Sequence, residues 1–245
     1  MTATTFLPGD TILLKSGSVW NGEWLWPKGS GTAAAPIKID KYGGDALPVI
    51  NGMGIDRGMN YSGAVHLRNQ EYWEIRNLEV TNDDDFDVDI DLSRPQGDNS
   101  WSSQAETRNG ILIIADGDLL NDDDDGIFDH IYIENCYVHD VDGPNDWNDT
   151  FTGGIIYNVV GTKIRPNTSF RDIRIAYNTI RKVDLLGITG FVQMAKSGYQ
   201  DDVDTYNLWM EDIYIGHNYI EDVAQGGIDL CDARNAVVEY NVVDG

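Results

Sequence analysis

The sequence contains few cysteines and no long apolar run. Cys136 and Cys231 are too few for a disulfide scaffold and lack the CxxC spacing of a zinc site. We expect both to be plain buried thiols. No stretch of about 18 uncharged apolar residues exists, so no segment resembles a membrane-spanning helix. The first residues, Met1–Thr5, lack the basic and apolar regions of a signal peptide. These absences argue against a disulfide-stapled or membrane-embedded protein.

Basic residues are also scarce. Seventeen Lys and Arg stand against 41 Asp and Glu, for a formal net charge of −24. This charge repels nucleic acid and anionic membranes, so we expect neither as a partner. A hydrophobic content of 41% with seven Trp and twelve Tyr is too apolar for a disordered acidic chain. The composition therefore predicts a packed domain with an acidic surface.

An internal repeat is the most informative feature of the chain. Its copies carry apolar residues at relative positions 0, 2, 7 and 10, beginning at Ile131, Ile173 and Ile213. A fourth copy begins at Ala236 and a looser one at Trp73. Alternation at positions 0 and 2 is typical of a strand, and the phase shift to position 7 indicates a bend into a second strand.

A second marker, Gly followed by Ile, begins another short apolar run after most copies. It occurs at Gly110, Gly154, Gly187 and Gly227. Each coil is therefore expected to hold about three short strands. Such a unit cannot bury its apolar face alone, so successive coils must stack. The repeat predicts an all-β fold, a right-handed parallel β-helix with long loop insertions on one side.

One column of the repeat contains Asn178, Asn218 and Asn241, with Cys136 in the same position of an earlier copy. Stacked side-chain amides could hydrogen-bond along the axis of the solenoid. Alternatively, Asn is present because it tolerates a turn conformation. Either interpretation agrees with the predicted fold.

We expect a single domain over residues 1–245, with less regular coils in about 1–100 and regular coils in about 105–245. Short strands separated by turn residues, such as Thr11–Lys15 and Pro36–Ile39, are expected to start the solenoid. The chain ends at Gly245 just after a repeat copy, without the polar cap that solenoids normally need. We therefore expect it to be truncated at its C-terminus.

The run Pro8-Gly-Asp-Thr-Ile12, the pair Pro36-Ile37 with Tyr42-Gly43, and the repeated Ile-x-Ile-x-x-Asn coils resemble the pectate-lyase-like superfamily. This superfamily of right-handed parallel β-helix proteins is carbohydrate-active, and the resemblance covers nearly the whole chain. It implies the architecture more strongly than the activity, because the superfamily includes lyases, hydrolases, epimerases and non-catalytic adhesins.

Three insertions are expected to emerge from the same edge of the solenoid. Segments 115–128, 161–170 and 192–212 each lie between a Gly-Ile strand and the next Ile-x-Ile strand. They would stack into a wall beside a groove that suits an extended polymer. Aromatic residues in or beside the insertions are predicted to stack on sugar rings: Trp147, Tyr199, Tyr206 and Trp209.

Acidic residues follow the repeat copies at the next corner. The predicted catalytic carboxylates are those of Asp140, Asp142, Asp184, Asp222 and Asp229. Equivalent positions stack at about 4.8 Å per coil, which would place Asp142 beside Asp184 and Lys182 between Asp140 and Asp222. Carboxylates about 5 Å apart suit a retaining glycoside hydrolase, and about 6.5–9.5 Å suits an inverting one. Turn-forming aspartates that face water are the structural alternative.

A calcium ion (Ca²⁺) is a second possibility. Asn121, Asp123 and Asp125, followed by Gly126, match the first half of a calcium loop. The match ends there, because the twelfth position holds Tyr132 instead of a bidentate Glu. The sequence thus predicts at most a looser calcium site.

Three functions remain open: a calcium-assisted lyase on uronic-acid polymers, a glycoside hydrolase with paired aspartates, and a non-catalytic carbohydrate-binding or structural solenoid. The lyase is slightly favoured. Resemblance to a Gly-Phe-Ala-x-Lys segment of one pectate lyase family implies Lys196 as its base, with extra residues in the spacing. The scarcity of Lys and Arg argues for the hydrolase. In each case we expect an extracellular monomer whose partner is a polysaccharide.

Overall fold

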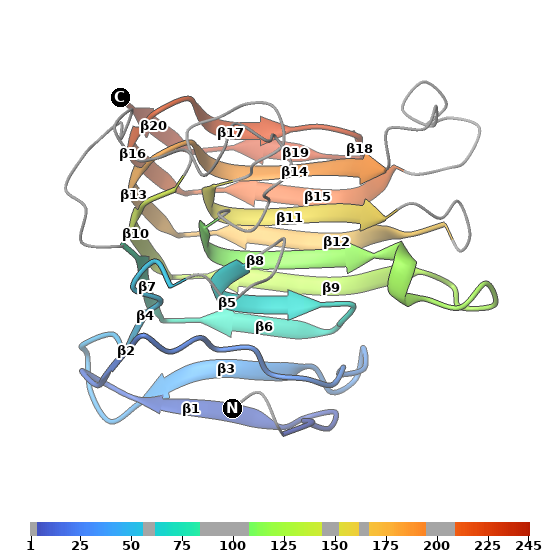
Figure 1. Ribbon diagram of the computed structural model, residues 1–245, viewed down its shortest axis with the longest axis horizontal. Coiled ribbons are helices and arrows are strands. Elements are labelled where there is room, and N and C mark those ends of the chain that lie inside the picture. The colour runs from blue at the N-terminus through green and yellow to red at the C-terminus, as the bar shows by residue number, and fades with distance from the viewer. Residues whose placement is uncertain (1–3, 56–61, 84–107, 144–151, 162–166, 195–208) are drawn as a thin grey trace.

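The computed structural model describes residues 4–55, 62–83, 108–143, 152–161, 167–194 and 209–245. These residues form short β-strands and one 3-10 turn, η2 (Gly117–Leu119). The coils stack from the N-terminus at the bottom to the C-terminus at the top (Figure 1). The expected all-β solenoid is therefore confirmed in outline.

The strands form three sheets, which we call sheets I, II and III. Sheet I contains β1 (Thr11–Lys15), β3 (Ile37–Tyr42), β6 (Trp73–Arg76), β9 (Ile127–Glu134), β12 (Ser169–Ala176), β15 (Met210–Gly216), β18 (Ala233–Arg234) and β19 (Val237–Glu239). Sheet II contains β2 (Val19–Asn21), β4 (Val49–Asn51), β7 (Glu79–Asn82), β10 (Tyr137–Val141), β13 (Thr179–Val183), β16 (Tyr219–Val223) and β20 (Val242–Asp244). Sheet III contains β5 (Ser62–Arg68), β8 (Arg108–Asp116), β11 (Gly153–Gly161), β14 (Leu186–Met194) and β17 (Gly226–Leu230).

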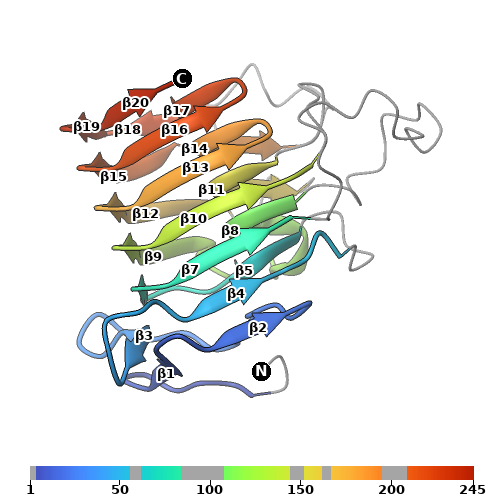
Figure 2. The same cartoon turned by 90° about the vertical axis from the view of Figure 1, so that its left-hand side faces the viewer.

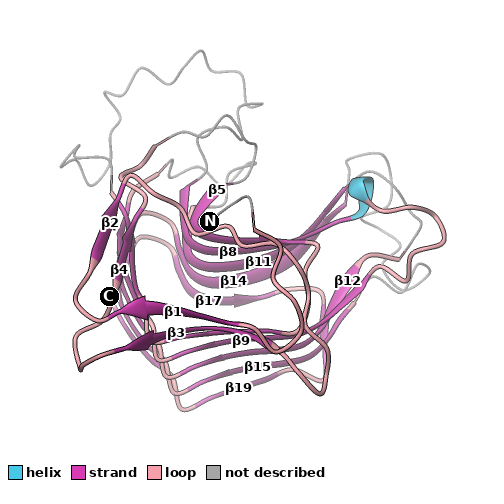
Figure 3. Cartoon of the chain, turned by 90° about the horizontal axis from the view of Figure 1, so that it is seen from below, coloured by secondary structure: helices cyan, strands magenta, loops and turns pink. Residues whose placement is uncertain are grey.

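Strand pairing within these sheets is parallel throughout the described residues. From β3 to β18 the chain passes from sheet I to sheet II to sheet III and then returns to sheet I one coil higher (Figure 2). Viewed along the axis, the three sheets surround one interior (Figure 3). The prediction of about three short strands per coil is thus confirmed.

The repeat aligns in space as it does in sequence. Ile131 pairs in register with Ile173, which pairs with Ile213, and all three are at most 1% exposed. The loosest copy, at Trp73, pairs with Ile131 in the same column. Positions 0 and 2 of the repeat therefore face the core from sheet I, and positions 7 and 10 face it from sheet II.

Asparagine side chains form a ladder along the axis. The Oδ1 atom of Asn218 accepts hydrogen bonds from the backbone N and the Nδ2 of Asn178, at 3.0 and 3.1 Å. Asn241 accepts equivalent bonds from Asn218, both at 2.9 Å. Asn178 Oδ1 in turn accepts from the backbone N of Cys136 at 2.9 Å. The amide-ladder interpretation is confirmed.

The residue before each ladder position makes the turn. Tyr177, His217 and Tyr240 have φ values of 59°, 59° and 54°, in the left-handed region, whereas the ladder asparagines do not have positive φ. The alternative interpretation, that asparagine tolerates the turn, is therefore wrong. The strained turn residues instead stack their rings on one another, with centroids 4.8 and 5.0 Å apart.

The glycine of the Gly-Ile marker faces a crowded interior. A Cβ on Gly154 would lie 2.7 Å from Ile180 Cγ2, and one on Gly110 would lie 2.3 Å from Val138 Cγ1. Gly227 is equally close to Val243. Each corner between sheets II and III therefore needs a residue without a side chain, which explains why the marker recurs.

The two thiols differ. Cys136 is buried and Cys231 is exposed, so the expectation that both are buried is wrong for Cys231. Cys231 follows β17, a strand of sheet III near the C-terminal end of the solenoid whose residues are only partly buried. Among the described residues, no helix has the length and apolar character needed to cross a membrane.

Candidate functional site

Aspartates stack at the corner where sheet II leads into sheet III. Asp140, Lys182 and Asp222 lie between register-paired residues of β10, β13 and β16, and have φ values of 47°, 50° and 53°. The predicted column is therefore present, with a left-handed bulge in each coil. The Asp140 carboxylate already has polar partners, because it lies 2.5 Å from His139 Nδ1 and 3.7 Å from Lys182 Nζ.

The second predicted column is also present. Asp184 donates its backbone N to the carbonyl of Val141, the residue before Asp142, at 3.2 Å. Its Oδ2 accepts a hydrogen bond from the backbone N of Gly143 at 2.9 Å. Both Asp142 and Asp184 have further partners. The Asp184 carboxylate thus already serves the corner structure.

Asp222 and Asp229 differ from the other predicted carboxylates. Within the described part of the chain, neither side chain takes part in a hydrogen bond or an ion pair. Asp222 is exposed at the end of β16, and Asp229 is partly buried in β17 of the same coil. They are therefore the two aspartates most available to a substrate.

Asp229 lies on the outer face of sheet III. Residues of the neighbouring strands point alternately into the core and outward. Ile155, Tyr157 and Ile188 belong to the core, whereas Ile156 belongs to a separate outer cluster. That cluster consists of Leu112, Ile114, Ile156, Val160, Leu185 and Leu186. Pairing in register forms an outward row in which His66, Leu112, Ile156, Thr189 and Asp229 follow one another.

Three polar side chains on this outer face are buried without a partner. His66 and Asn158 are 0% exposed and Thr189 is 3% exposed. Within the described residues, both ring nitrogens of His66, both amide atoms of Asn158 and the hydroxyl of Thr189 make no hydrogen bond. Burial lowers the pKa of His66 to about 3, and Arg68 adds to the effect, so the ring is neutral near pH 7.

The long connections occur at both ends of the sheet III strands. Segments 115–128, 161–170 and 192–212 all join sheet III to sheet I, so their predicted common edge is confirmed. At that edge, Gly117 lies against Thr168 of the next coil. However, the aspartates of the corner columns lie at the opposite end of strands about nine residues long, roughly 26 Å away.

The acidic corners and this wall therefore lie at opposite ends of the sheet III strands. Long connections also join sheet II to sheet III. They run from β7 (ending at Asn82) to β8 (starting at Arg108), and from β10 to β11. Counting residues between Val141 and Gly153 would have revealed them, since the neighbouring corner at Asp184 is only two residues long.

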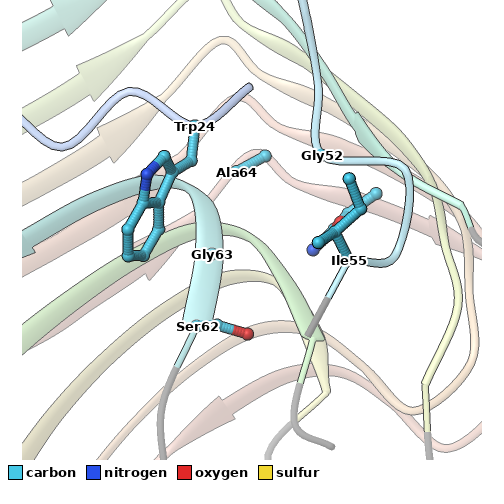
Figure 4. Close-up of a pocket in the computed structure, with 7 residues that line it drawn as sticks. Trp24, Gly52, Ile55, Ser62, Gly63 and Ala64 are labelled. Carbon is cyan, nitrogen blue, oxygen red and sulfur yellow. The ribbon is translucent and has the colours of Figure 1, made fainter. Parts of the chain in front are cut away.

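A small pocket lies at the same sheet II–sheet III corner in the first coils (Figure 4). Together with the open solvent at its mouth it has a volume of about 200 Å³, and it is lined by Trp24, Gly52, Ile55, Ser62, Gly63, Ala64 and Asn82. The ring of Trp24 packs edge-on against Trp26, which in turn stacks on His66 at 4.9 Å. These tryptophans precede the recognisable repeat copies, so the repeat spacing does not predict their position.

Of the aromatic residues predicted to bind sugar, Trp209 is described. It lies before β15, and the guanidinium of Arg234 lies 4.9 Å from the centre of its ring. Trp147, Tyr199, Tyr206 and the predicted base Lys196 fall outside the described residues. Their roles stay predictions.

The predicted calcium loop is an exposed turn between η2 and β9. Its acidic side chains bind the loop itself: Asn121 N donates to Asp124 Oδ2 at 2.7 Å, and Ile127 N donates to Asp125 Oδ1 at 3.3 Å. No group of three or more His, Cys, Asp or Glu side chains in the described ranges converges to hold a metal ion. Calcium binding by Asn121, Asp123 and Asp125 stays a prediction.

Comparison with known proteins finds a glycosidase of similar sequence. A lacto-N-biosidase of Bifidobacterium longum subsp. longum is 28% identical over 286 aligned positions, covering 97% of this chain. The alignment covers 17% of that relative, so this chain spans about a sixth of its length. No family model matches the sequence.

Solved structures agree on the architecture. Two crystal structures of a GH136 lacto-N-biosidase from Eubacterium ramulus superpose with TM-scores of 0.76 and 0.77 at 24% identity. The superposition covers 98% of this chain and 40% of each solved chain. At this identity, the likeness shows a shared fold. The predicted pectate-lyase-like membership is supported only loosely.

Proposed function

We propose that this chain is the β-solenoid part of a glycoside hydrolase and that Asp222 and Asp229 carry its chemistry. The lacto-N-biosidase that is 28% identical over nearly the whole chain is the observation that carries the proposal. It favours the hydrolase alternative over the calcium-assisted lyase that the sequence slightly favoured. A hydrolase also needs no Lys196 base and no cation.

The choice of carboxylates follows from their surroundings. Asp140 is paired with His139 and Lys182, and Asp184 accepts a backbone hydrogen bond. Asp222 and Asp229 are unengaged among the described residues and belong to one coil, joined by the corner at Ala224–Gln225. They flank the same end of the outer face of sheet III, where a substrate can reach both.

Two carboxyl groups suffice for glycosidic hydrolysis. One, protonated, donates its proton to the leaving-group oxygen, and the other, ionised, either attacks the anomeric carbon or activates a water molecule. Their separation in the substrate complex determines the stereochemical outcome. The remainder of the site must hold the sugar, because general acid–base catalysis requires hydrogen-bond reach.

The test is hydrolysis of the p-nitrophenyl glycoside of lacto-N-biose, the sugar after which the relatives are named. Asp222→Asn and Asp229→Asn should each lower kcat about 10²–10⁴-fold. Asp212→Asn is the matched control, since Asp212 is also exposed and has a φ of 58°, but lies on sheet I. Equal activity of all three variants would contradict the assignment.

Uronic-acid polymers should be assayed in parallel. Formation of unsaturated uronate ends, detected by their ultraviolet absorbance and abolished by EDTA, would restore the lyase hypothesis. If neither substrate is cleaved but oligosaccharide binds, the chain is the non-catalytic solenoid considered above.

The proposal includes three finer features. We propose a right-handed coil, because parallel crossover connections are right-handed in about 98% of proteins. We also propose that the protein acts outside the cell, where glycans are available, and that it acts as a monomer. Scattering in solution measures the last of these directly.

A further inference from the structure

Polar groups beside Asp229 lack the partners that buried polar groups normally have. Thr189 is paired in register with Asp229, so these side chains are neighbours on adjacent strands, about 5 Å apart at Cα. Asn158 is paired with Phe191, two residues beyond Thr189 on the same strand, and is therefore its diagonal neighbour. Both side chains are on the outer face, since Tyr157 and Ile188 beside them belong to the core.

The orphaned atoms are those of Asn158 Oδ1, Asn158 Nδ2 and Thr189 Oγ1. More than nine-tenths of buried polar groups in proteins have a partner, and a buried polar group without one lowers stability. Two adjacent exceptions on one face call for an explanation. A ligand that supplies the missing hydrogen bonds is such an explanation.

The chemistry of these atoms indicates the kind of ligand. A carboxamide and a hydroxyl each both donate and accept hydrogen bonds, as the hydroxyl and amide groups of a sugar do. Apolar side chains adjoin them, namely Leu112, Ile114 and Ile156. Arg68, the cation on this face, is already bound to Asp116. The outer face of sheet III thus offers a few polar groups among apolar side chains, and its described residues include no free cation. Such a surface suits a neutral carbohydrate.

We infer that Asn158 and Thr189 form a sugar-binding subsite on the outer face of sheet III, next to Asp229. The identity of the ligand rests on the proposed function, but the subsite itself rests on the unpartnered atoms. Thr189 contacts the sugar unit nearest to the Asp229 carboxylate. Asn158 contacts the same unit or its neighbour from β11.

The experiment exploits an unusual expectation, that removing a binding group does not destabilise the free protein. Thr189→Val deletes an unpartnered hydroxyl at nearly constant volume, so Tm should stay equal or rise. Kd for lacto-N-biose, measured by isothermal titration calorimetry on the full chain, should rise about tenfold. Thr189→Ser keeps the hydroxyl and should keep Kd within about threefold of the wild type.

Asn158→Leu provides a second, independent variant with the same pair of expectations. A fall in Tm for Thr189→Val and Asn158→Leu would show that both groups have structural partners, and would overturn the inference. Unchanged Kd in both variants would overturn it as well. So would a failure of the wild type to bind lacto-N-biose or any glycan of an array of neutral oligosaccharides.

This outcome can be separated from that of the proposed function. Hydrolysis that depends on Asp222 and Asp229 but not on Thr189 supports the function and rejects the subsite. Binding that depends on Thr189 without any hydrolysis supports the subsite and rejects the function.

Discussion

The asparagine ladder makes a quantitative prediction about stability. In the middle of the ladder, the Asn218 side chain accepts from Asn178 N and Nδ2, and donates to Ile175 O and Asn241 Oδ1, at 2.9–3.1 Å. Asn218→Ala leaves the buried N–H of Asn178 and the carbonyl of Ile175 without these bonds. At about 1–3 kcal/mol for each orphaned buried group, the free energy of unfolding should fall by about 3 kcal/mol or more.

The matched control is Asn241→Ala at the exposed end of the same ladder. Asn241 makes the same kinds of bond to Asn218 and Ile215, but it lies in a coil whose side chains are mostly exposed. Water can replace its bonds, so its loss should lower stability by about 1 kcal/mol.

Equilibrium unfolding in urea, followed by circular dichroism, measures both values, provided that each transition is two-state. Equal losses for the two variants, or a loss below about 1 kcal/mol for Asn218→Ala, would refute the reasoning. The ladder would then be a by-product of the turn rather than a source of stability.

Three further predictions concern thiols, pH and calcium. Burial raises the pKa of the Cys136 thiol to about 12. A thiol reagent should therefore label Cys231 alone in the native protein and both cysteines after unfolding. Labelling of Cys136 in the native protein would contradict the described core. Folding lowers the pKa of His66 from 6.5 to about 3, so the contribution of the neutral ring to stability is complete above pH 6.5 and declines below it. Between pH 7 and pH 4 the free energy of unfolding of the wild type should fall by about 3 kcal/mol more than that of His66→Phe. Parallel pH profiles of the two proteins, measured by unfolding in urea, would be the opposing result. If the Asn121–Asp125 loop binds calcium, Tm should rise with calcium chloride and fall with EDTA in the wild type but not in Asp123→Ala; no calcium effect on the wild type would remove the calcium hypothesis.

The stacking of coils was predictable because it depends on spacing within the chain. Ile131, Ile173 and Ile213 occupy equal positions in their repeat copies, and parallel pairing in register converts that equality into a column. The same reasoning correctly placed Asp140, Lys182 and Asp222 together. Any feature that follows from repeat position alone could be read in this way.

The hydrogen-bond and ion-pair partners of individual side chains were not predictable from the spacing of the repeat. Asp140 and Asp222 share a column, yet only Asp140 has a His139 neighbour and a lysine one coil away within reach. Thr189 does not belong to a motif, and its importance arises from burial without a partner. Such differences depend on which groups face one another across coils, and a single sequence does not record this.

The recurring corner glycine has a consequence for how such a protein can change in length. Asn178 and Asn218 occupy the same position in successive coils and are 40 residues apart. An insertion of a few residues within a strand would move a bulky side chain into the space that Gly154 or Gly187 leaves open. A duplication or deletion of one whole turn of the solenoid would keep each glycine opposite its aliphatic neighbour. The natural unit of evolution, and of protein engineering, in this molecule is therefore the complete coil.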